Sequence, residues 1–95
     1  MLVQNLNGTG DISCHCSSWL DHWEKYNPSG RYALFCAARD CNNIAKVGAH
    51  VKKYRSADMH RYIVPLCHEC NQRAGSIDIG DTPLASANVA ETCGK

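Results

Sequence analysis

The most regular pattern of apolar positions follows a cysteine pair near the start of the chain. Trp19, Trp23 and Tyr26 recur at spacings of four and three, which places three aromatic rings on one face of a helix. Ser17-Ser18 offers a cap for the first turn, and Asn27-Pro28 ends the helix. The pattern predicts a short amphipathic helix whose aromatic face belongs to the core.

The middle of the chain carries the apolar pattern of strands. Ile44, Val47 and Val51 around Gly48 predict a short hairpin or a bent strand. In Ile63-Val64-Pro65, the β-branched pair before proline indicates the end of another strand.

The later part of the chain has weaker signals. The residues after Cys70 are compatible with a helix that Gly75 closes. From Gly80 to Cys93 the chain is rich in small residues, which predicts a loop with one edge strand. Together with the N-terminal helix, these segments predict an α+β fold.

Composition changes this picture. The 95 residues predict one domain, residues 1–95, and they include seven cysteines, five histidines and a single phenylalanine. Ordering a backbone costs about 1–2 kcal/mol per residue, so a domain with few large apolar side chains needs disulfides, metal or a partner.

The compartment decides between disulfides and metal. The first residues have neither the basic nor the apolar region of a secretory signal, and the longest small and apolar run, residues 33–38, is far shorter than a membrane span. We therefore expect a cytoplasmic protein with no membrane segment. In a reducing compartment closely spaced cysteines are usually metal ligands, and an odd total of seven does not suit a disulfide framework.

Two cysteine pairs have the spacing of zinc knuckles. Four residues separate Cys36 from Cys41, and two separate Cys67 from Cys70. Together they predict a closed tetrahedral Zn²⁺ site, structural rather than catalytic. The alternative, a redox dithiol at Cys67 and Cys70, lacks a βαβ context and leaves the other pair unexplained.

Three cysteines remain after this assignment. Cys14, Cys16 and Cys93 with His22 would complete a second zinc site of three sulfurs and one nitrogen, which ties the two ends of the chain together. The alternative is that the three are ordinary thiols. Other histidines that could take the fourth position are His15, His50 and His60.

The segment from Cys36 to Arg73 resembles the His-Asn-His (HNH) nuclease superfamily in its zinc-stabilised form. The resemblance rests on the paired knuckles, on Gly48-Ala49-His50-Val51, on Ile63-Val64-Pro65-Leu66-Cys67, and on Asn71 directly after the second knuckle. It implies a treble-clef, or ββα-metal-like, core at about residues 36–74.

The resemblance also implies a possible reaction. In the family one divalent ion, here Mg²⁺ or Mn²⁺, is held against a phosphate, and a histidine activates the attacking water. His50 matches that base and Asn71 the final metal-binding position. Tyr62 stands where the family has its central asparagine, and Ala49 where it often has aspartate; nearby His60 could substitute as a ligand or brace.

Both residues also have simpler interpretations. His50 could be the fourth ligand of the second zinc or form a hydrogen bond in the core, and Asn71 could only cap a helix.

Charge indicates the kind of partner. The whole chain has a net charge of +1, but residues 46–61 carry five cations against Asp58, a local charge of +4. Such a segment attracts a phosphate backbone, so the expected partner is DNA or RNA. Two functions follow: a DNA-cleaving domain of the HNH type, or a non-catalytic zinc module that binds nucleic acid or protein. The five cations are Lys46, Lys52, Lys53, Arg55 and Arg61.

Overall fold

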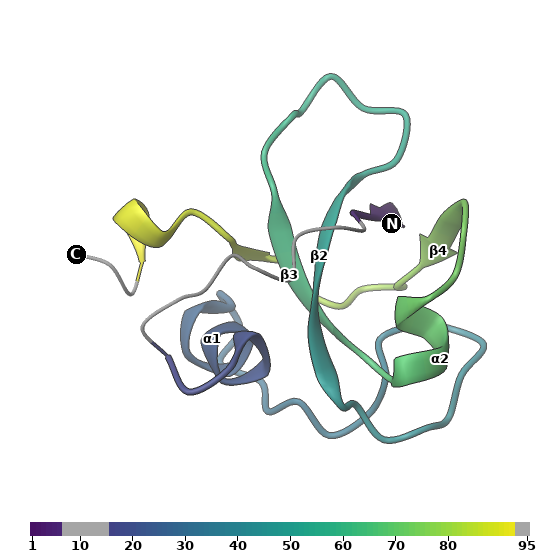
Figure 1. The fold of residues 1–95 in the computed structure, drawn as a ribbon, viewed down its shortest axis with the longest axis horizontal. Coiled ribbons are helices and arrows are strands. Elements are labelled where there is room, and N and C mark those ends of the chain that lie inside the picture. The colour runs from purple at the N-terminus through teal and green to yellow at the C-terminus, as the bar shows by residue number, and fades with distance from the viewer. Residues whose placement is uncertain (7–15, 93–95) are drawn as a thin grey trace.

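The computed structural model, which describes residues 1–6 and 16–92, has an antiparallel sheet of five strands with a helix packed across it (Figure 1). The strand order is β4-β1-β2-β3-β5. The predicted α+β class is confirmed. The elements are β1 (Leu2–Asn5), α1 (Trp19–Tyr26), β2 (Val47–Lys53), β3 (Tyr62–Leu66), α2 (His68–Asn71), β4 (Ser76–Asp78), β5 (Ala85–Ser86) and a 3-10 helix (Val89–Glu91).

The predicted N-terminal helix is confirmed as α1. It begins after Ser18, whose side-chain oxygen accepts a hydrogen bond from the amide of Asp21 at 3.1 Å. It ends at Asn27, the residue before proline. Trp23 is almost completely buried, and its indole nitrogen donates to the carbonyl of Pro83 at 2.9 Å. The aromatic face of the helix therefore belongs to the core, as the spacing predicts.

The cap of α1 gives a small, testable effect. We expect Ser18→Ala to lower the free energy of unfolding by about 1 kcal/mol, because the amide that the serine oxygen accepts from loses its partner. Ser17→Ala is the matched control, because Ser17 is also an exposed serine but does not occupy the cap position. Urea denaturation followed by circular dichroism measures both. Equal stabilities of the two variants would contradict the capping role.

The central hairpin is longer than the sequence predicts. Val47 and Val51 belong to a single strand, β2, which pairs with β3 from Val47 opposite Leu66 to Val51 opposite Tyr62. The expected strand end at Pro65 is wrong, because β3 continues to Leu66.

The second helix is shorter than predicted. α2 begins inside the knuckle, with Cys67 as its N-cap, and ends at Asn71. Gly75 closes a turn rather than a helix: its φ of 79° is a left-handed conformation that favours glycine, and it leads into β4. The expected edge strand in the tail is confirmed as β5.

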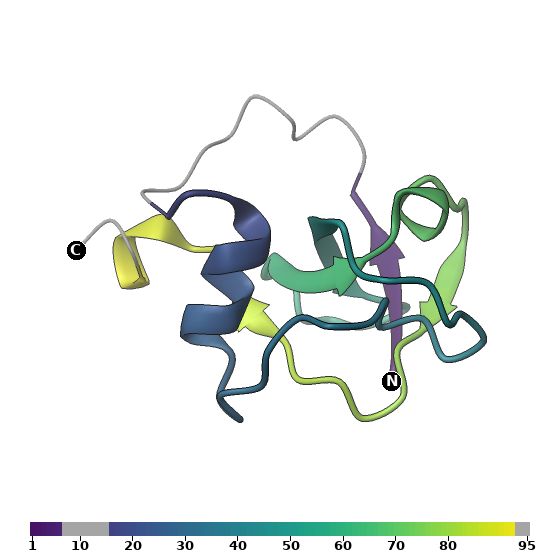
Figure 2. The same ribbon diagram turned by 90° about the horizontal axis from the view of Figure 1, so that it is seen from below.

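The two faces of the sheet have different cores. On one face α1 packs Trp23 against Ile63 and Ala85. On the other face, Val51 and Leu66 pack with the buried cysteines. Figures 1 and 2 show α1 and α2 on opposite sides of the β2–β3 hairpin. This division decides which site residues can meet.

Helix α1 lies directly on the backbone of β2 at Gly48. A Cβ atom added to Gly48 would lie 2.3 Å from the carbonyl carbon of Trp19 and 2.6 Å from the amide nitrogen of Leu20. Only glycine permits this approach. None of the described helices is long and apolar enough to cross a membrane.

Candidate metal centre

The four knuckle cysteines meet beside the sheet although they come from three separate segments. Cys36 and Cys41 lie in the loop before β2, Cys67 follows β3, and Cys70 lies in α2. Their sulfur atoms all lie within 4.8 Å of one another, and the sulfurs of Cys41 and Cys67 are 3.7 Å apart. The predicted cluster is therefore present.

This geometry fits one zinc ion. Zn–S bonds of about 2.3 Å in a tetrahedron separate the sulfurs by about 3.8 Å, which matches the measured 3.7 Å. Cys36, Cys67 and Cys70 are buried and Cys41 is half-buried. Four thiolates fill the coordination of zinc and leave no position for substrate, so the site is suited to hold the fold together.

Backbone hydrogen bonds shape the first knuckle. The amide of Cys36 donates to the carbonyl of Asn43 at 2.8 Å, and the amide of Cys41 donates to Ala38 at 3.0 Å. The amide of Ala37 donates to the carbonyl of Pro65 at 2.8 Å, which fixes the knuckle to β3. The loop thus holds both sulfurs toward the second pair.

The polar surroundings favour charge on one sulfur. Burial acts to raise the pKa of Cys67, but hydrogen bonds from the amide of Cys70, from the side chain of Asn43 and from neighbouring thiols outweigh it and lower that pKa to about 6. Burial raises the pKa of Cys36 and of Cys70. Zinc supplies the positive charge that ionises the remaining thiols. The sequence analysis did not predict this role of Asn43, although the residue lies only two positions after Cys41 and so close to the expected ligands.

The redox interpretation lacks a disulfide between the two knuckles. Cys36, Cys41, Cys67 and Cys70 are free thiols, and the 3.7 Å between the Cys41 and Cys67 sulfurs far exceeds a bond of about 2.05 Å. Convergence of both pairs on one point favours metal over an isolated dithiol.

The ligands expected for a second site are only partly described. Cys14 and Cys93, like the alternative ligand His15, lie outside the described residues. Cys16 and His22 are described, and the sulfur of Cys16 lies 3.9 Å from Nδ1 of His22. The other alternative, His60, is exposed at the hairpin, where its Nδ1 lies 2.8 Å from the carboxylate of Asp58.

His50 is enclosed between the sheet and α1. Its side chain is 7% exposed, and its ring meets the indole of Trp19 edge-on with 4.5 Å between centroids. Its Nε2 atom is buried and has no hydrogen-bond partner among the described residues. Burial lowers the pKa of His50, and the nearby Arg61 and His22 act in the same direction. The ring is therefore neutral at physiological pH and shielded from a substrate in solution.

Asn71 lies on the other face of the sheet from His50. The side-chain amide of Asn5 donates to the backbone carbonyl of Asn71 and lies 2.9 Å from its Oδ1. Asn5 is the cross-strand partner of Val51, so the two share a face, whereas His50, adjacent to Val51, points to the opposite face and contacts Trp19. The structure does not bring the two expected catalytic residues together.

The remaining HNH-like position is occupied by a different interaction. The hydroxyl of Tyr62 donates to the carboxylate of Asp58 at 2.6 Å, which holds the hairpin loop rather than a metal. This hydrogen bond, with those from the backbone and ring of His60, lowers the pKa of Asp58. Across residues 1–6 and 16–92, the cysteine cluster is the one group of three or more ligand side chains placed to hold a metal. No described cluster corresponds to a Mg²⁺ or Mn²⁺ site.

The five cations do not form a single patch. Lys46 precedes β2, whereas Lys52 and Lys53 end it; six residues at about 3.3 Å each separate the two places by roughly 20 Å. Arg55 and Arg61 lie in the loop that follows β2, and both are exposed. The basic surface is therefore the tip of the β2–β3 hairpin, without Lys46.

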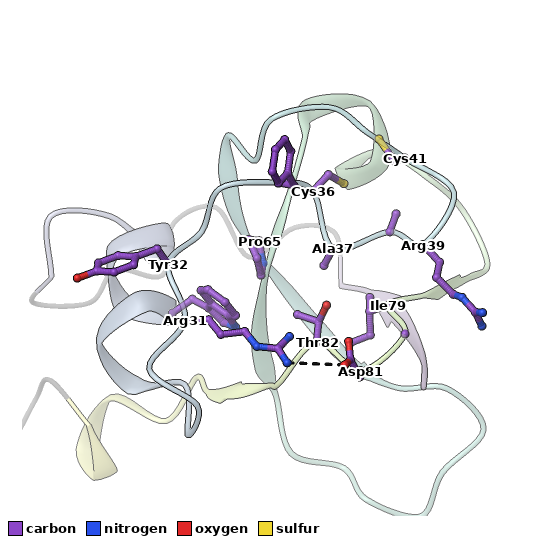
Figure 3. Close-up of a pocket in the computed structure, with 14 residues that line it drawn as sticks. Arg31, Tyr32, Cys36, Ala37, Arg39, Cys41, Pro65, Ile79, Asp81 and Thr82 are labelled. Atoms are coloured by element: carbon purple, nitrogen blue, oxygen red, sulfur yellow. Dashed lines mark ion pairs between the residues drawn. The ribbon is translucent and has the colours of Figure 1, made fainter.

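A pocket of about 320 Å³ opens beside the first knuckle (Figure 3). Cys36 and Cys41 line its end nearest α2, and Ile79 lies on its floor. The ion pair of Arg31 and Asp81, 3.6 Å apart, joins the segment before the knuckle to the loop after β4. Both side chains are well exposed, so the pair adds little stability.

No protein family, curated protein or solved structure compared with this chain matches it. Its function therefore has to be argued from its own cysteine cluster and surface.

Proposed function

We propose that this chain is a zinc-stabilised, HNH-like treble-clef domain that binds double-stranded DNA through the tip of its β2–β3 hairpin and does not hydrolyse it at His50. The observation that carries the proposal is the position of four cations, Lys52, Lys53, Arg55 and Arg61, within residues 52–61, where β2 ends and the chain turns back to β3; Figure 1 shows this connection projecting from the sheet.

The order of elements supports the treble-clef assignment. A knuckle with Cys36 and Cys41 comes first, the β2–β3 hairpin follows, and the second knuckle, Cys67 and Cys70, opens a helix. This order agrees with the resemblance of residues 36–73 to the HNH superfamily.

The charges at the tip favour a phosphate partner. Lys53 lies 3.2 Å from Asp58 and is neutralised by it. Lys52, Arg55 and Arg61 form no ion pair with any residue of the described ranges, so their charge is available to phosphates. The major groove of B-form DNA is wide enough to admit a projecting hairpin, whereas the major groove of an RNA duplex is too narrow.

Two observations favour binding over hydrolysis. His50 is buried beneath Trp19, so it cannot reach a water molecule beside a bound phosphate without displacement of α1. Asn71 lies on the opposite face of the sheet and interacts with Asn5. The base must reach the attacking water and the ligand must hold the metal ion at the same phosphate, so two residues on opposite faces of the sheet are not placed to act together.

Binding to a fluorescein-labelled DNA duplex tests the proposal. We expect weak binding whose affinity falls with salt. The Lys52→Glu/Arg55→Glu variant should have an affinity about tenfold lower, because two phosphate contacts are lost, and its affinity should depend less on salt, by about one counterion per contact. Lys25→Glu in α1, at an exposed lysine far along the chain from the hairpin, lowers the net charge by as much as Lys52→Ala/Arg55→Ala does and should bind more tightly than that variant. Binding that is equal in all variants would contradict the hairpin assignment.

A nicking assay distinguishes the two interpretations of the HNH resemblance. Plasmid DNA incubated with protein and Mg²⁺ or Mn²⁺ should stay supercoiled. Nicking that disappears in a folded His50→Ala variant would show that His50 is catalytic and would overturn the non-hydrolytic part of the proposal.

A further inference from the structure

The contact between Cys16 and His22 has the features of a second metal site. The two side chains come from the segment before α1 and from α1 itself, and Nδ1 of His22 lies 3.9 Å from the sulfur of Cys16. A tetrahedral zinc ion with bonds of about 2.3 Å to sulfur and about 2.0 Å to nitrogen holds such atoms about 3.5 Å apart. The observed separation is within a few tenths of an ångström of that value.

The second nitrogen of His22 fixes the orientation of the ring. Nε2 of His22 lies 2.7 Å from the backbone carbonyl of Ser86 in β5. A carbonyl oxygen can only accept, so Nε2 carries the hydrogen and Nδ1 of the neutral ring presents its lone pair toward Cys16. Metal-binding histidines usually donate their other N–H to a carbonyl or carboxylate in this way.

The position of His22 is unusual for a histidine without a special role. Its side chain is completely buried, and its ring lies beside those of Trp19 and Tyr26, with centroids 4.8 and 4.9 Å away. A neutral ring oriented by Ser86 and flanked by aromatic rings is prepared to bind a cation without further rearrangement.

We propose that Cys16 and His22 bind a second zinc ion, separate from the four-cysteine cluster. Cys14 and Cys93, which the sequence analysis also considers as ligands, lie outside the described residues, so the proposed site comprises Cys16 and His22. His50 is the weaker choice, because it is not gathered with Cys16 and His22 into a ligand group among the described residues. The ion would join the segment before α1 to His22, whose ring is hydrogen-bonded to Ser86 in β5.

Native mass spectrometry of the zinc-loaded protein tests the proposal. We expect two zinc ions per chain in the wild type and one in Cys16→Ser and in His22→Gln. The matched controls His60→Gln and His68→Gln change exposed imidazoles and should retain two. His50→Gln should also retain two.

A spectroscopic measurement covers the case in which a variant fails to fold. Wild-type protein loaded with ¹¹³Cd²⁺ should give two cadmium resonances, one from four sulfurs and one from a site that includes nitrogen. A single resonance together with one zinc ion per chain would overturn the proposal. So would a second ion that persists in both Cys16→Ser and His22→Gln.

Discussion

Removal of zinc by a chelator is expected to unfold this domain. The four sulfurs come from the loop before β2, the end of β3 and α2, and three of them are buried within the same core as Val51 and Leu66. Structural zinc sites contribute about 10–16 kcal/mol of apparent binding free energy, which equals or exceeds the whole stability of a small domain. Without the ion, four converging thiols remain in the core and the loop loses its main constraint.

Amide NMR spectra and thermal melts measure this effect. EDTA or a stronger chelator should collapse the dispersion of the amide resonances, and added Zn²⁺ should restore it while Mg²⁺ should not. Cys36→Ser and Cys70→Ser should behave like the chelated protein. His68→Ala is the matched control, because this residue lies between the second pair of cysteines but is exposed and outside the cluster. A chelated sample with unchanged dispersion and Tm would contradict the structural role of zinc.

The second large effect is expected from Gly48→Ala. The added methyl group would lie 2.3 Å from the carbonyl carbon of Trp19 and 2.5 Å from its oxygen, and both are backbone atoms that cannot turn away. Helix α1 must shift as a whole, which also disturbs the packing of Trp23. We expect a loss of about 3 kcal/mol in the free energy of unfolding and a fall in Tm of roughly 15 °C.

Gly30→Ala is the comparison that isolates this steric effect. Gly30 has a φ of 68°, and an added Cβ there meets no atom within 4 Å, so its substitution costs only the backbone term of about 1–2 kcal/mol. Thermal denaturation in excess zinc should therefore rank wild type first, Gly30→Ala second and Gly48→Ala last. The reverse order of the two variants would show that α1 does not rest on β2 in the way described.

Local signals explain which elements could be predicted from the sequence. The aromatic spacing of Trp19, Trp23 and Tyr26 and the serine cap lie within one segment, and α1 matches them closely. β1 carries no comparable signal, since Leu2–Asn5 is four residues long and acquires its partners only from β2 and β4, far along the chain. The extension of β3 through Pro65 also depends on tertiary structure, because the proline lies opposite Gly48 of β2.

The candidate site shows the same distinction. Spacing within each knuckle predicts the four cysteine ligands, because a tight turn alone sets the distance between paired sulfurs. Whether the side chains of His50 and Asn71 meet depends instead on the face of the sheet on which each lies. In a strand this changes with every residue, and the sequence does not specify which face α1 covers. The split of Lys46 from the hairpin cations likewise depends on the direction of β2.

The place of β1 in the sheet has a consequence for the order of events on the ribosome. β1 lies between β2 and β4, so this strand is synthesised before both of its neighbours and receives one at residues 51–53 and the other only at residues 76–78. Until residue 78 has left the exit tunnel, Val3 has no complete shelter, and the nascent polypeptide carries an unpaired apolar segment that can associate with other chains.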